Sequence, residues 1–178
     1  IDKRKILLSA TIDEINGYTY LTKDIRDMIE LNYLCDYNIK IPVFDSKAND
    51  RTICQYIIDK HYINTIVYCA GINESKKICQ MLNSIEPGFA KHIDCNTPTR
   101  ERNTILDDFV NGRLKCITNC RILVEGFNAA ITKNIVFLHP PRDKIATVQI
   151  IGRALRLHQS KTVANVLLPY NREDDLST

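Results

Sequence analysis

The chain has 178 residues, of which 44% are hydrophobic and 25% are charged, and its formal net charge is +3. This apolar content is enough for a sizeable core and excludes an intrinsically disordered chain, and the small net charge does not by itself indicate an anionic partner. The sequence contains no apolar run of about 18 residues and opens with no signal peptide, so we expect an intracellular protein (cytoplasmic, nuclear or viral) without a membrane partner.

The seven cysteines show neither a metal-binding nor a disulfide pattern. Their number is odd, and no two of them form a Cys-x-x-Cys pair. The closest two, Cys116 and Cys120, have no histidine near them in sequence, so we expect no zinc site. We expect most of the thiols to be reduced and to pack as small hydrophobic groups.

The first half of the chain predicts helices and strands that soon alternate regularly. A short apolar run at 6–8 reads as a strand that ends in Ser9, Ala10 and Thr11. A helix is expected near 24–31, and the sequence NIKIPVF at 38–44 alternates like a strand. The following elements are a helix at 51–62, a strand at 64–70, a helix at 74–85 and a strand at 89–94.

The second half continues this alternation. Thr97 is expected to cap a helix that has Pro98 in its first turn and ends near Asn111. Strands follow at 114–119, 134–139 and 162–169, with an arginine-containing helix before the last of them. Strands that alternate with helices predict an α/β fold, in which a mostly parallel central sheet has helices on both faces. Ligands bind such sheets at the carboxyl ends of the strands.

The segment QIIGRALRLH, residues 149–158, is the most unusual of the predicted helices. Its two arginines present planar forks that suit anions with several oxygen atoms, and its glycine lets a ligand approach the backbone. The alternative is an ordinary solvated helix face. In a helical projection, one face carries Gln149, Gly152, Arg153 and Arg156, and the opposite aliphatic face carries Val148, Ile151, Ala154 and Leu155.

Two other segments follow predicted strands and carry groups that suit phosphate or sugar oxygens. In CAGINESK, Gly71 frees the backbone just ahead of a helix start, where unpaired N–H groups attract phosphates. In TNCRILVEGFN, Thr118 offers a hydroxyl group at a strand end. Glu125 and Gly126 then form a tight polar turn before Asn128. The alternatives are an ordinary strand-to-helix turn in the first segment and a plain exit from the strand in the second.

The order and spacing of SAT, CAGINESK, TNCRILVEGFN and QIIGRALR resemble motifs III, IV, V and VI of superfamily 2 helicases and translocases. The resemblance covers nearly the whole chain, and Gln-x-x-Gly-Arg-x-x-Arg is its most specific part. Within the superfamily, residues 35–44 and the series NCRILVEGFN, FLHPPRDK and VQIIGRALR are similar to the type III restriction-like (DEAD/DEAH-type) branch. That branch includes predicted helicases of bacteria and large DNA viruses.

The resemblance implies a two-lobed motor with ATP in the cleft between two RecA-like domains, of which this chain supplies the second. Arg153 and Arg156 would be arginine fingers, with Arg156 closer to the γ-phosphate, and Gln149 would orient the nucleotide or the attacking water. Asn128 stands where the family usually has an aspartate that contacts the ribose. The residues implied to contact the nucleotide are Glu125, Gly126, Asn128 and Gly152.

The resemblance also implies a nucleic-acid partner, and we favour DNA over RNA. Backbone contacts would hold a single strand without reading its sequence. The residues implied in these contacts are Thr118, Gly71, Ile72 and Thr97, although Thr97 is equally explained as a helix cap. Ser9, Ala10 and Thr11 would couple the two motor domains.

The sequence contains no Gly-x-x-x-x-Gly-Lys-Ser/Thr and no acidic quartet ahead of SAT. ATP and Mg²⁺ are therefore expected to bind mainly to an N-terminal RecA-like domain of the same protein, and this chain alone is expected not to hydrolyse ATP. The expected division is 1–12 as the tail of that first domain, 13–36 as a connection, 37–170 as the second RecA-like domain and 171–178 as a tail.

Two functional hypotheses follow from the sequence. The leading hypothesis is the C-terminal half of an ATP-dependent nucleic-acid helicase or translocase, and the alternative is a non-catalytic RecA-like module that binds nucleic acid or a protein. The paired guanidinium groups argue against a mere scaffold. A dinucleotide-binding dehydrogenase domain is excluded because no Gly-x-Gly-x-x-Gly follows the first strands.

Overall fold

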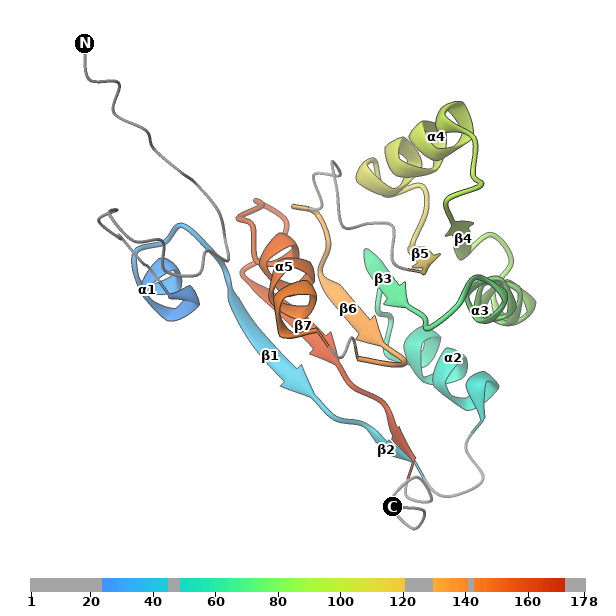
Figure 1. Cartoon of the computed structure of the whole chain (residues 1–178), viewed down its shortest axis with the longest axis horizontal. Helices are drawn as coiled ribbons and strands as arrows, with labels where there is room; N and C mark the ends of the chain where they lie inside the picture. Colours follow the sequence, from blue (N-terminus) through green and yellow to red (C-terminus); the bar gives the residue numbers. More distant parts are fainter. Residues whose placement is uncertain (1–23, 45–48, 121–129, 141–142, 172–178) are drawn as a thin grey trace.

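The computed structural model describes residues 24–44, 49–120, 130–140 and 143–171. Six parallel strands form one central sheet in the order β1-β7-β6-β3-β5-β4 (Figure 1). A short parallel pair, β2 (Val43–Phe44) and β8 (Tyr170–Asn171), lies beyond the ends of β1 and β7. The strands of the central sheet are β1 (Asp36–Lys40), β3 (Thr65–Tyr68), β4 (Ala90–Ile93), β5 (Cys116–Asn119), β6 (Asn134–Phe137) and β7 (Val163–Leu167).

Helices cover both faces of the sheet, which confirms the predicted α/β fold. One hydrophobic core contains Ile57 and Leu82, from the helices α2 and α3, and a second core contains Phe109 and Leu155, from α4 and the end of α5. Each of these large apolar side chains is almost fully buried, which stabilises the fold by about 1.5–3 kcal/mol per side chain. The helices are α1 (Ile25–Glu30), α2 (Asp50–Asp59), α3 (Ile72–Ile85), α4 (Thr99–Val110) and α5 (Lys144–Ala154).

The strand β3 lies in the interior of the sheet between β6 and β5. All four of its residues are buried because α2 and α3 cover one face and the α4/α5 layer covers the other. A strand enclosed on both faces reads as a continuous apolar run, which explains why NTIVYCA shows no polar alternation.

The strand predicted at 38–44 is two strands in the structure. Pro42 separates β1 from β2, because proline has no backbone N–H group to continue a hydrogen-bond ladder. The carbonyl oxygen of Pro42 still accepts a hydrogen bond from the backbone N–H of Tyr170 at 3.0 Å. The chain therefore continues in the same direction, but β1 pairs with β7 whereas β2 pairs with β8.

The predicted capping role of Thr97 is wrong. The helix α4 begins at Thr99, with Pro98 as the residue before it. Thr97 instead closes a turn with Asp94, because its hydroxyl oxygen accepts from the Asp94 N–H group at 2.9 Å. Its own N–H group donates to the Asp94 carbonyl at 3.1 Å.

The arginine-containing helix is shorter than its sequence pattern predicts. The helix α5 ends at Ala154, so Arg156 lies beyond the helix rather than on its face. The residues just before β1 bind the backbone that follows the helix. The Cys35 N–H group donates to the Leu155 carbonyl oxygen at 2.8 Å, and Leu34 pairs with Arg156 in an isolated β-bridge. The buried side of α5 also includes Ile150, which the helical projection did not place on the aliphatic face.

Candidate functional site

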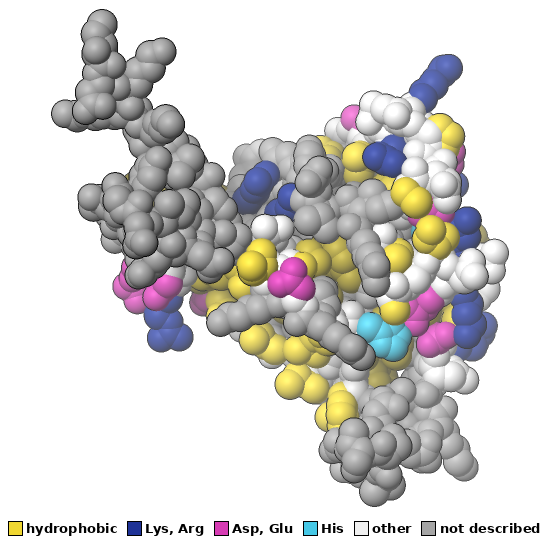
Figure 2. Space-filling view, viewed as in Figure 1, with side chains coloured by type: hydrophobic (Ala, Val, Ile, Leu, Met, Phe, Trp, Pro, Cys, Tyr) yellow, Lys and Arg dark blue, Asp and Glu magenta, His cyan; other side chains and the backbone are white. Residues whose placement is uncertain are grey.

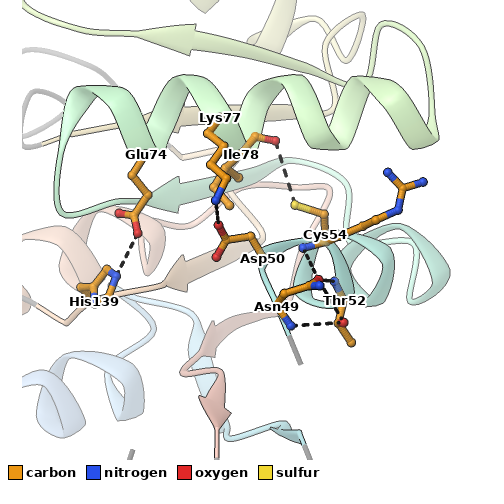
Figure 3. A network of polar contacts seen from close by, with 9 residues as sticks. Asn49, Asp50, Thr52, Cys54, Glu74, Lys77, Ile78 and His139 are labelled. Carbon is orange, nitrogen blue, oxygen red and sulfur yellow. Dashed lines mark hydrogen bonds and ion pairs between the residues drawn. The ribbon is translucent and has the colours of Figure 1, made fainter. Parts of the chain in front are cut away.

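A contact between a carboxylate and an imidazole joins two turns at the carboxyl ends of neighbouring strands. The strand β3 leads through Ala70 and Gly71 into α3, and β6 leads to His139. Glu74, in the first turn of α3, accepts a hydrogen bond from the Ala70 N–H group at 2.7 Å, and its other carboxylate oxygen lies 2.9 Å from His139 Nε2 (Figure 3). The two turns are therefore held in a fixed position relative to each other.

The backbone around Gly71 is open. Among the described residues, a Cβ atom added at Gly71 would meet no other atom within 4 Å, and the N-cap position of α3 has no side-chain hydrogen bond. Gly71 and Ile72, which the sequence implicates in nucleic-acid binding, are both partly exposed there. Packing among the described residues therefore does not itself require a glycine at this position.

The position of the Thr118 side chain differs from the one expected for a group that contacts nucleic acid. Its side chain is fully buried, and its hydroxyl group donates to the carbonyl oxygen of Ser75 at 3.0 Å. The thiol of Cys120, just after β5, similarly lies 3.3 Å from the Ala70 carbonyl oxygen. These contacts fasten the end of β5 to the start of α3, and they leave the Thr118 hydroxyl no access to a nucleic-acid strand.

A polar chain of Ser75, His92 and Asp94 links α3 to the edge strand β4. Ser75 Oγ lies 2.7 Å from His92 Nδ1, and His92 Nε2 lies 3.1 Å from a carboxylate oxygen of Asp94. The contact with His92 is the main cause that lowers the pKa of Asp94 to about 2, against an ordinary value of 3.8. The three residue types are those of a hydrolytic triad, but Ser75 is fully buried and cannot reach a substrate.

The turn that follows Asp94 is also fixed. The guanidinium group of Arg102, on α4, donates to the carbonyl oxygens of Asp94 and Thr97, each at 3.3 Å. Thr97 is only partly exposed, and its hydroxyl group is engaged within the turn. Any contact of Thr97 with a strand would therefore come from a preformed turn.

The helix α5 keeps a polar side that the core does not use. Gln149, Gly152 and Arg153 are partly exposed, and Arg156 is exposed just beyond the helix. A Cβ atom added at Gly152 would meet no atom of the described segments within 4 Å. Burial raises the pKa of Tyr68 on β3, and the positive charge of Arg153 acts in the opposite direction.

The structure does not bring all of the predicted site residues into one cluster. Gly71, Ile72 and Thr97 follow the carboxyl ends of strands, whereas Arg156 lies beside Leu34, just before the amino end of β1. The residues Ser9, Ala10, Thr11, Glu125, Gly126 and Asn128 lie outside the described residues.

Sequence reasoning missed Glu74, Ser75 and His139. The position of His139 directly after an apolar strand was the available signal, since groups at such ends meet at one edge of a parallel sheet. The sequence around Ser75 did not indicate its role. Its hydrogen bonds to His92 and Thr118 depend on the packing of β4 and β5 beside α3.

Within the described ranges, no group of three or more His, Cys, Asp or Glu side chains could hold a metal ion. All seven cysteines are free thiols, and burial is the main cause that raises the pKa of Cys54 and of Cys69 to about 12. None of the described helices is both long and apolar enough to cross a membrane.

Comparison with known proteins identifies the family. Residues 48–158 match the family described as the helicase conserved C-terminal domain. This chain belongs to that family. The match includes α2 through α5 and the arginine segment, and it confirms the resemblance to superfamily 2 helicases on which the sequence interpretation depends.

Two curated relatives show how much of a larger protein the chain represents. A putative ATP-dependent helicase of Saccharomyces cerevisiae, IRC3, is 32% identical over 76 residues, which is 43% of this chain and 11% of that protein. A 51.5 kDa protein of a Lactococcus phage is 27% identical over 109 residues, which is 61% of this chain and 24% of that protein. The chain thus spans at most about a quarter of these relatives.

Solved structures share the fold at low sequence identity. A fragment of a putative HsdR subunit of a type I restriction enzyme from Vibrio vulnificus has a TM-score of 0.68 and 18% identity, over 81% of this chain and 33% of that one. The ATP-dependent Type ISP restriction-modification enzyme LlaBIII has a TM-score of 0.67 and 18% identity, over 82% of this chain and 12% of that one. A DEAD box protein from Methanococcus jannaschii has a TM-score of 0.60 and 18% identity, over 82% of this chain and 38% of that one. These matches confirm the RecA-like architecture.

Proposed function

We propose that this chain is the C-terminal motor domain of an ATP-dependent nucleic-acid helicase or translocase. In this proposal it supplies arginine side chains to ATP held by another RecA-like domain and helps to hold a nucleic-acid strand. The observation that carries the proposal is the polar side of α5, where Gln149, Gly152 and Arg153 remain accessible and Arg156 follows immediately. The name of the Saccharomyces cerevisiae relative, a putative ATP-dependent helicase, agrees with it.

The arginines are proposed to act on the transferring phosphoryl group. A guanidinium group neutralises negative charge that develops there, which is worth about 10³–10⁵ in rate. Gln149 would orient the nucleotide or the attacking water, and the open backbone at Gly152 would permit close approach. Glu125, Gly126 and Asn128 remain proposed nucleotide contacts.

The side chains described here do not provide a metal site, so the proposal assigns Mg²⁺ and the phosphate cradle to the other RecA-like domain. Arginine forks suit the terminal phosphate of ATP because they bind phosphate oxygens in pairs. The sequence also lacks the P-loop that would cradle the nucleotide. The chain alone is therefore proposed to be inactive as an ATPase.

The strand-binding part of the proposal rests on backbone groups. The uncapped first turn of α3 at Gly71 and Ile72 presents N–H groups at the carboxyl end of β3, and Glu74 and His139 hold this turn in place. On the face shown in Figure 2, the visible Lys and Arg side chains lie in separate groups rather than in one continuous patch. Backbone donors are proposed to contact the phosphates.

DNA is proposed as the strand because two of the structural neighbours carry it. LlaBIII was solved bound to DNA, and the Lhr helicase of Mycobacterium smegmatis, with a TM-score of 0.62 and 19% identity over 77% of this chain and 19% of that one, was solved with single-stranded DNA and AMP-PNP. ATPase rates of the full-length protein with single-stranded DNA, duplex DNA and RNA would identify the strand. Stimulation by RNA alone would contradict the choice of DNA.

The test of the arginine role is an Arg156→Ala variant of the full-length protein. The ATPase kcat is expected to fall by about 10³ or more, while the Kd for single-stranded DNA stays within about twofold. Arg113→Ala is the matched control, because that guanidinium is paired with Asp107 and Asp108 on the surface beside α4. An unchanged kcat in Arg156→Ala would remove the arginine-finger assignment and favour a non-catalytic binding module.

A further inference from the structure

A cavity of about 360 Å³ lies at the amino-terminal ends of β3, β6 and β7. Its walls are formed by the segments that lead into three neighbouring strands. These strand entries are residues 61–63 before β3, Lys133 before β6, and residues 160–162 before β7. A strand of four residues is about 13 Å long, so the cavity lies on the opposite edge of the sheet from Gly71 and His139. None of the described residues assigned above to ATP or to a nucleic-acid strand lines this cavity.

The cavity is positively charged. Lys133 and Lys161 line it together with His61, and none of its lining residues is an Asp or Glu. Among the residues that the structure describes, no carboxylate forms an ion pair with either lysine. Two ammonium groups in one cavity, with no carboxylate paired to them among the described residues, favour an anionic ligand.

Lys161 is fixed in its position by backbone carbonyls. Its ammonium group donates to the carbonyl oxygen of Thr132 at 2.7 Å and to that of Ala154. An ammonium group has three donor hydrogens, so one remains for a ligand. Burial is the main cause that lowers the pKa of Lys161 to about 8; the neighbouring Lys133 lowers it further, and Cys35 acts in the opposite direction.

The floor of the cavity is preorganised. The side-chain amide of Asn165 donates to Asn134 Oδ1 at 2.8 Å, and the amide of Asn134 donates to the Ile63 carbonyl oxygen at 2.7 Å. The backbone N–H group of Lys133 donates to the Asn64 carbonyl oxygen at 2.9 Å. These bonds join all three strand entries, so a ligand would meet groups that need little rearrangement.

We propose that this cavity is a second anion site, which binds a phosphate monoester between Lys133 and Lys161. A phosphate monoester carries a charge close to −2 at neutral pH, which matches two ammonium groups, whereas an internal phosphodiester of a nucleic acid carries only one negative charge. The cavity volume lies at the small end of ligand sites, so it suits a mononucleotide or a terminal phosphate. The proposal does not depend on the motor function proposed above.

The test is a calorimetric titration of the 178-residue chain with AMP, inorganic phosphate, and a short oligonucleotide with either a 5′-phosphate or a 5′-hydroxyl end. Lys133→Gln is expected to raise the Kd for AMP by about tenfold, because it removes one charged contact. Lys91→Gln is the matched control: it removes the same charge from an exposed position on β4 and is expected to leave the Kd unchanged. Lys161→Gln is less informative, since Lys161 also ties two backbone carbonyls together.

The four ligands separate the sources of the phosphate. Binding of AMP assigns a free nucleotide, and a preference for the 5′-phosphate over the 5′-hydroxyl oligonucleotide assigns a strand end. Binding should also weaken between about pH 7 and about pH 9, as Lys161 loses its proton while the phosphate monoester stays a dianion.

Three results would overturn the proposal. The first is no binding of any phosphate ligand, and the second is an equal loss of binding in Lys133→Gln and Lys91→Gln. The third is a loss of AMP binding in Arg156→Ala with none in Lys133→Gln, which would place the anion at the end of α5 instead.

Discussion

The hydroxyl group of Thr118 on β5 donates a hydrogen bond to the carbonyl oxygen of Ser75 on α3, at 3.0 Å in a fully buried position. The side chain of Ser75 continues the connection to His92 on β4 at 2.7 Å. Two strands and one helix are thereby joined through a single turn of α3. The Thr118 hydroxyl group, which the sequence predicts to be accessible, therefore has a structural role.

Replacing Thr118 by valine should reduce stability rather than strand binding. The substitution removes one buried hydrogen bond, which costs about 1 kcal/mol and lowers the Tm by about 2–4 °C. The Kd of the full-length protein for single-stranded DNA should stay within about twofold, because the hydroxyl group is not accessible. An unchanged Tm together with a tenfold weaker Kd would return Thr118 to the strand-binding surface.

Replacing Gly152 by alanine should separate folding from function. A Cβ atom at Gly152 meets no atom of the described residues within 4 Å, so the change should stabilise α5 by up to about 1 kcal/mol through its higher helix propensity. The ATPase rate of the full-length protein should fall, since the methyl group occupies space that a nucleotide needs. Asn103→Ala, at an exposed position of α4, should raise stability without changing the rate. An equal ATPase rate in Gly152→Ala would show that nothing approaches this part of α5.

The contact between Glu74 and His139 should be measurable as a coupling energy. A double-mutant cycle with Glu74→Gln and His139→Gln, followed by urea denaturation, should give a coupling energy of about 0.2–1 kcal/mol. The Asp50–Lys77 pair, which joins α2 and α3 at 2.8 Å, serves as the comparison, because it also links two separate elements at the surface (Figure 3). A coupling energy of zero would show that the contact between Glu74 and His139 does not hold the two turns together.

The Asp94 carboxylate should make the fold sensitive to acid. Its pKa in the folded chain, about 2, is lower than the ordinary 3.8, so its contribution to stability is complete above about pH 4 and is lost as the pH falls towards 2. The urea midpoint should fall across that range, and Asp94→Asn should flatten the fall. Asp107→Asn, at an exposed position, is the control. A midpoint of the wild-type chain that is level between pH 4 and pH 2 would contradict this role.

The alternation of apolar strands and amphipathic helices was sufficient to predict the α/β fold. The edges of the elements were harder to predict, because they depend on distant contacts. The helix α5 ends where Cys35 takes the Leu155 carbonyl, and no pattern within residues 149–158 reveals that contact. Thr97 was expected to cap α4, but the carboxylate and backbone of Asp94 compete successfully for its hydroxyl group.

The candidate site was predictable only in part, for a related reason. The glycine positions and the polar face of α5 are local properties, and the structure keeps Gly71 and Gly152 open. The burial of Thr118 depends on the packing of α3 over β5, which the sequence of either segment alone does not show. The same holds for the cavity beside Lys133 and Lys161, because its walls come from three separate strand entries.

The order of the sheet has a consequence for biosynthesis. Among the described strands of this sheet, β1 comes first in the sequence and pairs only with β7, which comes last. A nascent chain must therefore carry β1, with the exposed side chains of Tyr37 and Ile39, unpaired until nearly all of the domain has been made. A ribosome that stalls before residue 163 would therefore leave the edge of β1 without its neighbour, and unpaired strand edges are prone to aggregation.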